Sequence, residues 1–169
     1  MELERKWRLL NIPPTGLLRG EPQRLTQSYL PIDAGEHRIR TDGTTYWETW
    51  KSDGTIARTE TEQTISAQEY SDLLTPDLPI VTKDRYTFLD GGFTWLVDIC
   101  SGALEGLVLV ELEPAETGTA AEDVERVAAE LNAILFPTWL GQGIEVTADA
   151  RYKTKNLARY GIPPLKGAA

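Results

Sequence analysis

The chain contains only one cysteine, one histidine and one methionine among its 169 residues. The lone Cys100 excludes a disulfide within the chain, and one cysteine with one histidine excludes the usual structural zinc sites. No stretch approaches the roughly 20 apolar residues that a membrane span needs. The first residues, Met1 to Lys6, are not a basic end followed by an apolar run, so we expect no signal peptide. The expected location is the cytoplasm, with no membrane partner.

Basic residues are also scarce, with 17 Lys and Arg against 26 Asp and Glu and a net charge of −9. Nucleic-acid binding draws on basic patches spread over the surface, so we expect no nucleic-acid partner. A small polyanion is still open as a ligand. It would need bases gathered in one place, metal ions, or both.

The length indicates one domain, because 169 residues can bury a substantial core and the 41% hydrophobic content is ordinary for a globular protein. We predict a single domain over residues 1–162 and a frayed C-terminal tail over residues 163–169. The sequence leaves open whether the protein is a monomer or a homodimer.

Short segments with alternating apolar or β-branched residues predict eight strands in the first two-thirds of the chain. They cover residues 1–8, 25–31, 36–42, 45–51, 55–64, 80–89, 93–100 and 105–113. Several are separated by turn signals such as Asp42-Gly43 and Asp90-Gly91-Gly92. Since Asp-Gly between alternating runs is a strong hairpin cue, we expect mostly antiparallel neighbours.

Helical patterns interrupt and follow these strands. Residues 66–74 open with a capping box of Ser66 and Glu69, and residues 119–135 read as an amphipathic helix. A short strand over 143–147 and a short helix over 154–160 follow. The predicted fold is mainly β (α+β): an eight-stranded antiparallel closed β-barrel with helices packed outside, since closure removes exposed sheet edges.

The most informative feature is charge at every second residue of a predicted strand. Because side chains alternate between the two faces of a strand, such residues share one face. Five groups show this pattern: Glu2, Glu4 and Lys6; Arg38 and Arg40; Arg58, Glu60 and Glu62; Lys83 and Arg85; and Glu111 and Glu113.

A solvated sheet face is the simplest explanation for any one of these groups. Five strands carry the pattern, however, and like charges so close together repel each other. The alternate positions are apolar enough to pack against helices. If helices cover the outside, the charged faces point into the barrel.

A barrel lined with unpaired charge would be costly to fold, although glutamates can pair with Lys and Arg. Six glutamates in three close pairs are better satisfied by divalent cations, and carboxylates with phosphate oxygens are normal ligands of Mg²⁺. The remaining bases suit phosphate oxygens. The residues therefore indicate a metal-bound polyphosphate inside a tunnel.

The opening Glu2-x-Glu4-x-Lys6 resembles the EXEXK signature of CYTH domains, also called triphosphate tunnel metalloenzymes. The later charged groups and Lys51 follow in the order of that family, and the segment from Val146 to Ala158 extends the likeness to nearly the whole chain. The resemblance implies an eight-stranded antiparallel tunnel that acts on triphosphates with Mg²⁺ or Mn²⁺. The short bacterial inorganic tripolyphosphatases of the family are the most similar.

The resemblance also implies roles for individual residues. Triphosphate binding is expected from Lys6, Arg38, Arg40, Lys51, Arg58, Lys83 and Arg85. Metal binding is expected from Glu2, Glu4, Glu60, Glu62, Asp98, Glu111 and Glu113, where Asp98 could instead be a partner of an arginine. The candidate catalytic residues are Glu2, Glu4, Lys83 and Lys153, where a solvated lysine is the alternative for Lys153.

Several other residues have simpler readings. We expect Cys100 to be a small barrel residue and His37 to lie on the outer face. Tyr29 is read as barrel packing, with a tunnel gate as the alternative, and Trp47 and Trp50 as packing at the outer face or rim.

We predict a metal-dependent hydrolase in which water attacks the terminal phosphorus of inorganic tripolyphosphate, giving pyrophosphate and phosphate. A class IV adenylate cyclase and a thiamine or nucleoside triphosphatase are the enzymatic alternatives. A non-catalytic polyphosphate- or nucleotide-binding module is the alternative of another class.

Overall fold

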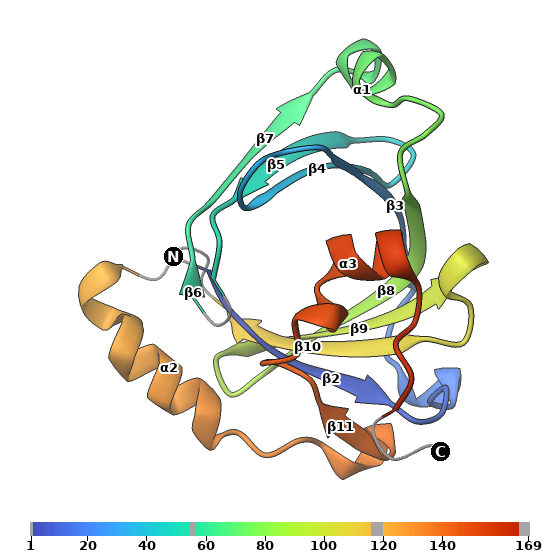
Figure 1. The fold of residues 1–169 in the computed structure, drawn as a ribbon. Coiled ribbons are helices and arrows are strands. Elements are labelled where there is room, and N and C mark those ends of the chain that lie inside the picture. The colour runs from blue at the N-terminus through green and yellow to red at the C-terminus, as the bar shows by residue number, and fades with distance from the viewer. Residues whose placement is uncertain (1, 55–56, 116–119, 166–169) are drawn as a thin grey trace.

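The structure is a computed structural model that describes residues 2–54, 57–115 and 120–165. Antiparallel strands form most of it, and three α-helices accompany them (Figure 1). The strands are β1 (Glu2–Leu3), β2 (Arg5–Leu9), β3 (Gln23–Leu30), β4 (Glu36–Thr41), β5 (Tyr46–Lys51), β6 (Ala57–Arg58), β7 (Glu60–Ile65), β8 (Ile80–Asp90), β9 (Phe93–Ser101), β10 (Val108–Pro114) and β11 (Gly143–Glu145). The helices are α1 (Ala67–Leu73), α2 (Val124–Ala133) and α3 (Thr154–Tyr160).

The predicted closed eight-stranded barrel is wrong. Nine strands form one curved sheet in the order β11-β2-β10-β9-β8-β3-β4-β5-β7, and β1 pairs with β6 in a separate two-stranded sheet. The sheet stays open because β11 pairs with β2 at Leu9, Arg8 and Trp7 and so occupies the edge that β7 would need. Only the segment before β2 is left to cross the gap, where Glu2 pairs with Arg58 and Leu3 with Ala57.

The outer face of the sheet is apolar, as the alternation predicts. On β10, Val108, Val110 and Leu112 are buried in a cluster with Trp7 of β2 and Leu131 of α2. A second cluster packs α1 against the outer face of β4 and β5. Both α1 and α2 therefore cover the outside of the sheet. The charged residues, which alternate with these apolar residues along the strands, face inward.

The third helix departs from the prediction that helices pack outside. Leu157 of α3 and the neighbouring Tyr152 are buried against inward residues such as Leu109 and Tyr29. Figure 1 shows α3 within the ring of strands. Together with Val81 and Cys100, these inward residues make one end of the inner face apolar, and α3 packs against it and fills that end of the space that the sheet surrounds.

The helix limits agree in part with the sequence patterns. The capping box of Ser66 and Glu69 opens α1 as predicted, whereas the second helix begins at Val124 after a 3₁₀ turn over residues 121–123. At the start of the predicted tail, Pro163 is buried and its carbonyl accepts a 2.7 Å hydrogen bond from Arg8. Residues 166–169 lie outside the described residues. In the described part of the chain, none of the helices has the length and apolar content to cross a membrane.

Arg5 ties three of these elements together on the outer face. Its Nη1 donates to the carbonyls of Leu131 and Ile134 at the C-terminal end of α2, both at 2.9 Å. Its Nε and Nη2 donate to Glu145 of β11 at 3.0 and 2.9 Å, and its guanidinium lies 4.6 Å from the Trp7 ring centre. A cation at a helix C-terminus also interacts favourably with the helix dipole.

We expect Arg5→Met to lower the free energy of unfolding by about 2 kcal/mol, because it leaves several helix carbonyls and Glu145 without their charged donor. Urea unfolding would measure the change. Arg126→Met is the matched control: among the described residues Arg126 pairs with Asp123 and Glu130 on the exposed side of α2, and its loss should cost under about 0.5 kcal/mol. Equal losses for the two variants would contradict this role for Arg5.

Candidate functional site

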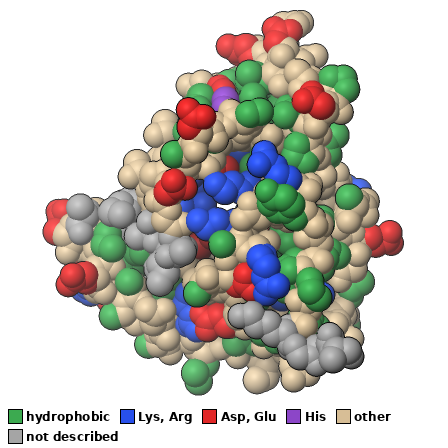
Figure 2. All heavy atoms as spheres, viewed as in Figure 1, with side chains coloured by type: hydrophobic (Ala, Val, Ile, Leu, Met, Phe, Trp, Pro, Cys, Tyr) green, Lys and Arg blue, Asp and Glu red, His purple; other side chains and the backbone are tan. Residues whose placement is uncertain are grey.

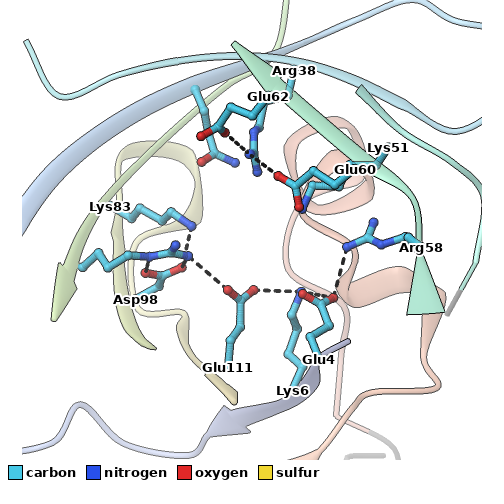
Figure 3. A network of polar contacts seen from close by, with 12 residues as sticks. Glu4, Lys6, Arg38, Lys51, Arg58, Glu60, Glu62, Lys83, Asp98 and Glu111 are labelled. Carbon is cyan, nitrogen blue, oxygen red and sulfur yellow. Dashed lines mark hydrogen bonds and ion pairs between the residues drawn. The ribbon is translucent and has the colours of Figure 1, made fainter. Parts of the chain in front are cut away.

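The inward faces of the strands bring charged side chains into two chains of ion pairs that lie opposite each other (Figure 3). The first chain comes from β6, β2, β10, β8 and β9 and from Glu4, which lies between β1 and β2. It links, in order, Arg58, Glu4, Lys6, Glu111, Arg85, Asp98 and Lys83. The shortest contacts join Asp98 to Lys83 Nζ at 2.5 Å and to Arg85 Nε at 2.6 Å. Asp98 is only 1% exposed, so these two bases neutralise a fully buried carboxylate.

The second chain comes from β4, β5 and β7. Glu62 accepts from Arg40 at 3.1 Å and from Arg38 at 3.4 Å, and Glu60 lies 3.2 Å from Lys51 Nζ. The Thr49 hydroxyl donates to Glu62 at 2.8 Å. Glu60 and Glu62 are partly exposed, because β7 is the last strand at this end of the sheet.

Lys and Arg side chains surround the hollow at the centre of the molecule in Figure 2. All seven bases predicted to bind triphosphate lie in the two chains, and each has an acidic partner. Two of them keep an unsatisfied N–H donor, since Nε of Arg38 and Nε of Arg40 are buried without a hydrogen-bond partner. The ion pairs therefore leave the hydrogen-bonding capacity of these two guanidinium groups incompletely used.

Mutual pairing stabilises most of these groups in their charged forms. Burial alone would lower the pKa of Lys6, but Glu111 and Glu4 outweigh it and raise that pKa above its ordinary value. Burial would raise the pKa of Glu111, but the surrounding bases, Lys6 foremost, hold it well below the ordinary range. Lys83 is different: burial and the neighbouring Arg85 lower its pKa, and Asp98 offsets them only in part.

One group of acids has the geometry of a cation site. Carboxylate oxygens of Glu4, Glu111 and Glu113 all lie within 4.8 Å of one another. Lys6 Nζ lies 3.0 Å from Glu111 and 3.6 Å from Glu4, so an ammonium group already compensates two of these acids. Three hard oxygen donors, two from β10 and one from the residue that precedes β2, fit Mg²⁺ or Mn²⁺. The residues present thus suit the metal that the sequence predicts.

The other predicted metal ligands are placed elsewhere. Glu60 and Glu62 lie in the opposite chain with Arg38, Arg40 and Lys51, and Asp98 pairs with Lys83 and Arg85. The side chain of Glu2 is outside the described residues. Lys153, a predicted catalytic residue, donates from Nζ to the Gly54 carbonyl at 2.6 Å.

Sequence reasoning missed three inward residues. Glu36 and Thr49 are buried on the inward faces of β4 and β5, where Glu36 pairs in register with Lys51 and Thr49 with Arg38. Trp47 also faces inward, opposite Arg40, so of its two predicted positions, the outer face is wrong and the rim agrees with the structure. Glu36 alternates with Arg38 and Arg40 on β4, and Thr49 and Trp47 alternate with Lys51 on β5, so strand parity could have found all three.

The positions expected for His37, Cys100 and Tyr29 agree with the structure. His37 lies on the outer face, where it contacts Glu48 at 2.7 Å and stacks on Trp50 with 5.0 Å between ring centres. Cys100 is a buried residue of the inner apolar cluster. Tyr29 packs in the same cluster, and its hydroxyl accepts a hydrogen bond from Gln27.

Comparison with known proteins places the chain in a family. It is 38% identical over 162 residues to an inorganic triphosphatase of Nitrosomonas europaea, a match that covers 93% of this chain and 96% of that protein. It is 31% identical to an inorganic triphosphatase of Acetivibrio thermocellus, covering 94% and 93% of the two chains. A crystal structure of an inorganic triphosphatase matches with a TM-score of 0.58 and 32% identity over 98% of this chain and 97% of that one. No family model matches the chain. These similarities confirm the resemblance drawn from the sequence: the chain belongs to the inorganic triphosphatase family.

Proposed function

We propose that this protein hydrolyses inorganic tripolyphosphate to pyrophosphate and phosphate, with water attacking the terminal phosphorus in the charged tunnel. The observation that carries the proposal is the convergence of seven bases and a three-carboxylate group on one cavity. Two relatives that match nearly the full length of the chain are both named inorganic triphosphatase. These names favour an inorganic substrate over a nucleotide or thiamine triphosphate.

Charge balance supports a metal requirement. A triphosphate that enters the tunnel competes with Glu4, Glu60, Glu62, Asp98 and Glu111 for the same bases. Each base that turns to a phosphate oxygen leaves a buried or half-buried carboxylate without its partner, which is strongly unfavourable. A divalent cation that enters with the substrate removes this penalty. We therefore propose Mg²⁺ or Mn²⁺ as the cofactor, held by Glu4, Glu111 and Glu113.

The side chains of the tunnel then have different roles in phosphate binding and in proton transfer. The arginines Arg38, Arg40, Arg58 and Arg85 offer paired donors to non-bridging oxygens, while Lys6 and Lys51 add compact charges. The bound metal would neutralise phosphate charge and lower the pKa of water. Lys83 has a lowered pKa, but its Nζ is paired with Asp98 as an ammonium, so it would accept the proton of the attacking water only after giving up a proton of its own. Preorganised charge supplies most of the rate enhancement in such a site.

Roles for Glu2 and Lys153 stay predictions. Lys153 lies close enough to Arg58 and Glu36 for these residues to influence its pKa, but its ammonium group is engaged with Gly54. The cytoplasmic location and the choice between monomer and homodimer are likewise predictions.

The test is to incubate purified protein with tripolyphosphate, ATP or thiamine triphosphate and to follow phosphate, pyrophosphate and cyclic AMP. We expect phosphate and pyrophosphate in equal amounts from tripolyphosphate with Mg²⁺ or Mn²⁺, and no turnover in excess EDTA. Cyclic AMP from ATP would instead support the cyclase, and faster turnover of an organic triphosphate would overturn the inorganic substrate. Tight tripolyphosphate binding without turnover of any compound would favour the binding module.

A further inference from the structure

Trp47 is the first inward residue of β5 after the turn that joins β4 to β5. Along these two strands three inward pairs follow one another: Glu36 with Lys51, Arg38 with Thr49, and Arg40 with Trp47. The first pair lies at the end that α3 fills, since Lys155 of α3 donates to the carbonyl of Gly35. Arg40 and Trp47 therefore lie at the opposite end, toward the open mouth of the tunnel.

At this mouth, Trp47 and Glu62 fix the position of Arg40 from two sides. The Arg40 guanidinium lies 5.2 Å from the centre of the Trp47 ring, and its Nη2 donates to Glu62 at 3.1 Å. Its Nε is buried without a hydrogen-bond partner. Burial and the neighbouring Arg38 also disfavour the charged form of Arg40 and lower its pKa to about 10. A cation in this position gains from an aromatic face and from an added anion.

We propose that Trp47 is a positioning residue for substrate binding, because its ring holds the Arg40 guanidinium ready for the outermost phosphate of the substrate. The inference rests on the proposed function, but it concerns an aromatic side chain that no charge pattern selects. Trp47 acts through Arg40 and touches no reacting atom. Its loss should therefore weaken binding of the triphosphate and leave the chemical step nearly unchanged.

The experiment compares Trp47→Leu with Trp50→Leu. These two tryptophans lie on the same strand, but Trp50 faces outward and stacks on His37. We expect Trp47→Leu to raise KM for tripolyphosphate about tenfold, with kcat within about twofold of the wild type. Trp47→Tyr keeps an aromatic face and should restore KM to within about threefold. Trp50→Leu should leave KM unchanged.

A double-mutant cycle with Arg40→Ala tests whether Trp47 acts through Arg40. KM of the double variant should equal KM of Arg40→Ala alone. An unchanged KM for Trp47→Leu, equal effects of the two tryptophan variants, or full additivity with Arg40→Ala would overturn the proposal. If Trp47→Leu does not fold, Trp47→Tyr and Trp47→Phe give the same comparison on a smaller scale.

Calorimetric titration with tripolyphosphate, without added metal, separates this inference from the proposed function. If the wild-type protein binds tripolyphosphate but hydrolyses none, the proposed function fails, and the dissociation constants of the same variants still test Trp47. A dissociation constant about tenfold larger for Trp47→Leu, with that of Trp50→Leu unchanged, would support the positioning role. Equal dissociation constants for Trp47→Leu and the wild type would reject it.

Discussion

Glu111→Gln should lower kcat for tripolyphosphate about 100- to 1000-fold, an effect of the size seen when a group aimed at the reacting charge is lost. Glu111 lies in the first ion-pair chain between Lys6 and Arg85, and it is one of three carboxylates that can hold a cation. Glutamine has nearly the same shape but no charge. The substitution therefore removes attraction for the metal while it leaves Lys6 and Arg85 in place for the phosphates.

Binding and turnover should consequently change in opposite directions. Calorimetry without metal should show tripolyphosphate binding to Glu111→Gln at least as tightly as to the wild type, because two bases lose a competing acid. Raising the Mn²⁺ concentration should recover part of the lost activity. Glu125→Gln, on an exposed residue of the first turn of α2, is the matched control and should behave as the wild type. Unchanged turnover of Glu111→Gln would reject the carboxylate group as a metal site.

Asp98→Asn should lower the free energy of unfolding by about 3 kcal/mol, since removing one partner of a buried charge cluster leaves the others uncompensated. Asp98 is the common partner of Lys83 and Arg85, and no other acid contacts Lys83 among the ion pairs of the described residues. Activity should fall as well, because both bases lose the contact that orients them. Urea unfolding and steady-state kinetics would measure the two effects.

The pH dependence of this loss has a definite sign. Burial would raise the pKa of Asp98, but Arg85 and Lys83 outweigh it and lower that pKa below its ordinary value. A carboxyl group with a lowered pKa stabilises the folded state above its unfolded pKa of about 4 and loses that contribution as the pH falls through its folded pKa. The stability difference between the wild type and Asp98→Asn should thus be constant between about pH 6 and 8 and shrink below about pH 4.

Asp84→Asn provides the matched control for Asp98. Asp84 lies on the opposite face of β8 and pairs with Arg24 at 3.0 Å in an exposed position. Its loss should cost under about 1 kcal/mol at any of these pH values. If the two aspartate variants lost equal stability, or if the Asp98 effect grew in acid, the assignment of Asp98 as a buried partner of the two bases would be wrong.

The alternation of residue types was sufficient to predict which side chains face the tunnel. A strand places neighbouring side chains on opposite faces whatever it pairs with, so Arg38 and Arg40, or Glu111 and Glu113, share a face before any tertiary contact forms. All seven predicted bases accordingly lie on the inward face. The helix of residues 154–160 was likewise readable from a local pattern.

Tertiary structure alone decided which of these side chains meet, because strand order and register depend on pairing between distant segments. Glu113 joins Glu4 through the pairing of β10 with β2, whereas Glu60 and Glu62 are carried by β7 to the other side of the tunnel. The same long-range choice lets β11 occupy the edge of β2, which keeps the sheet open, and sets α3 against its inner face. The sequence by itself determined the inward-facing charges, since side-chain alternation is local. Their division into a carboxylate group and two ion-pair chains follows only from the register between strands.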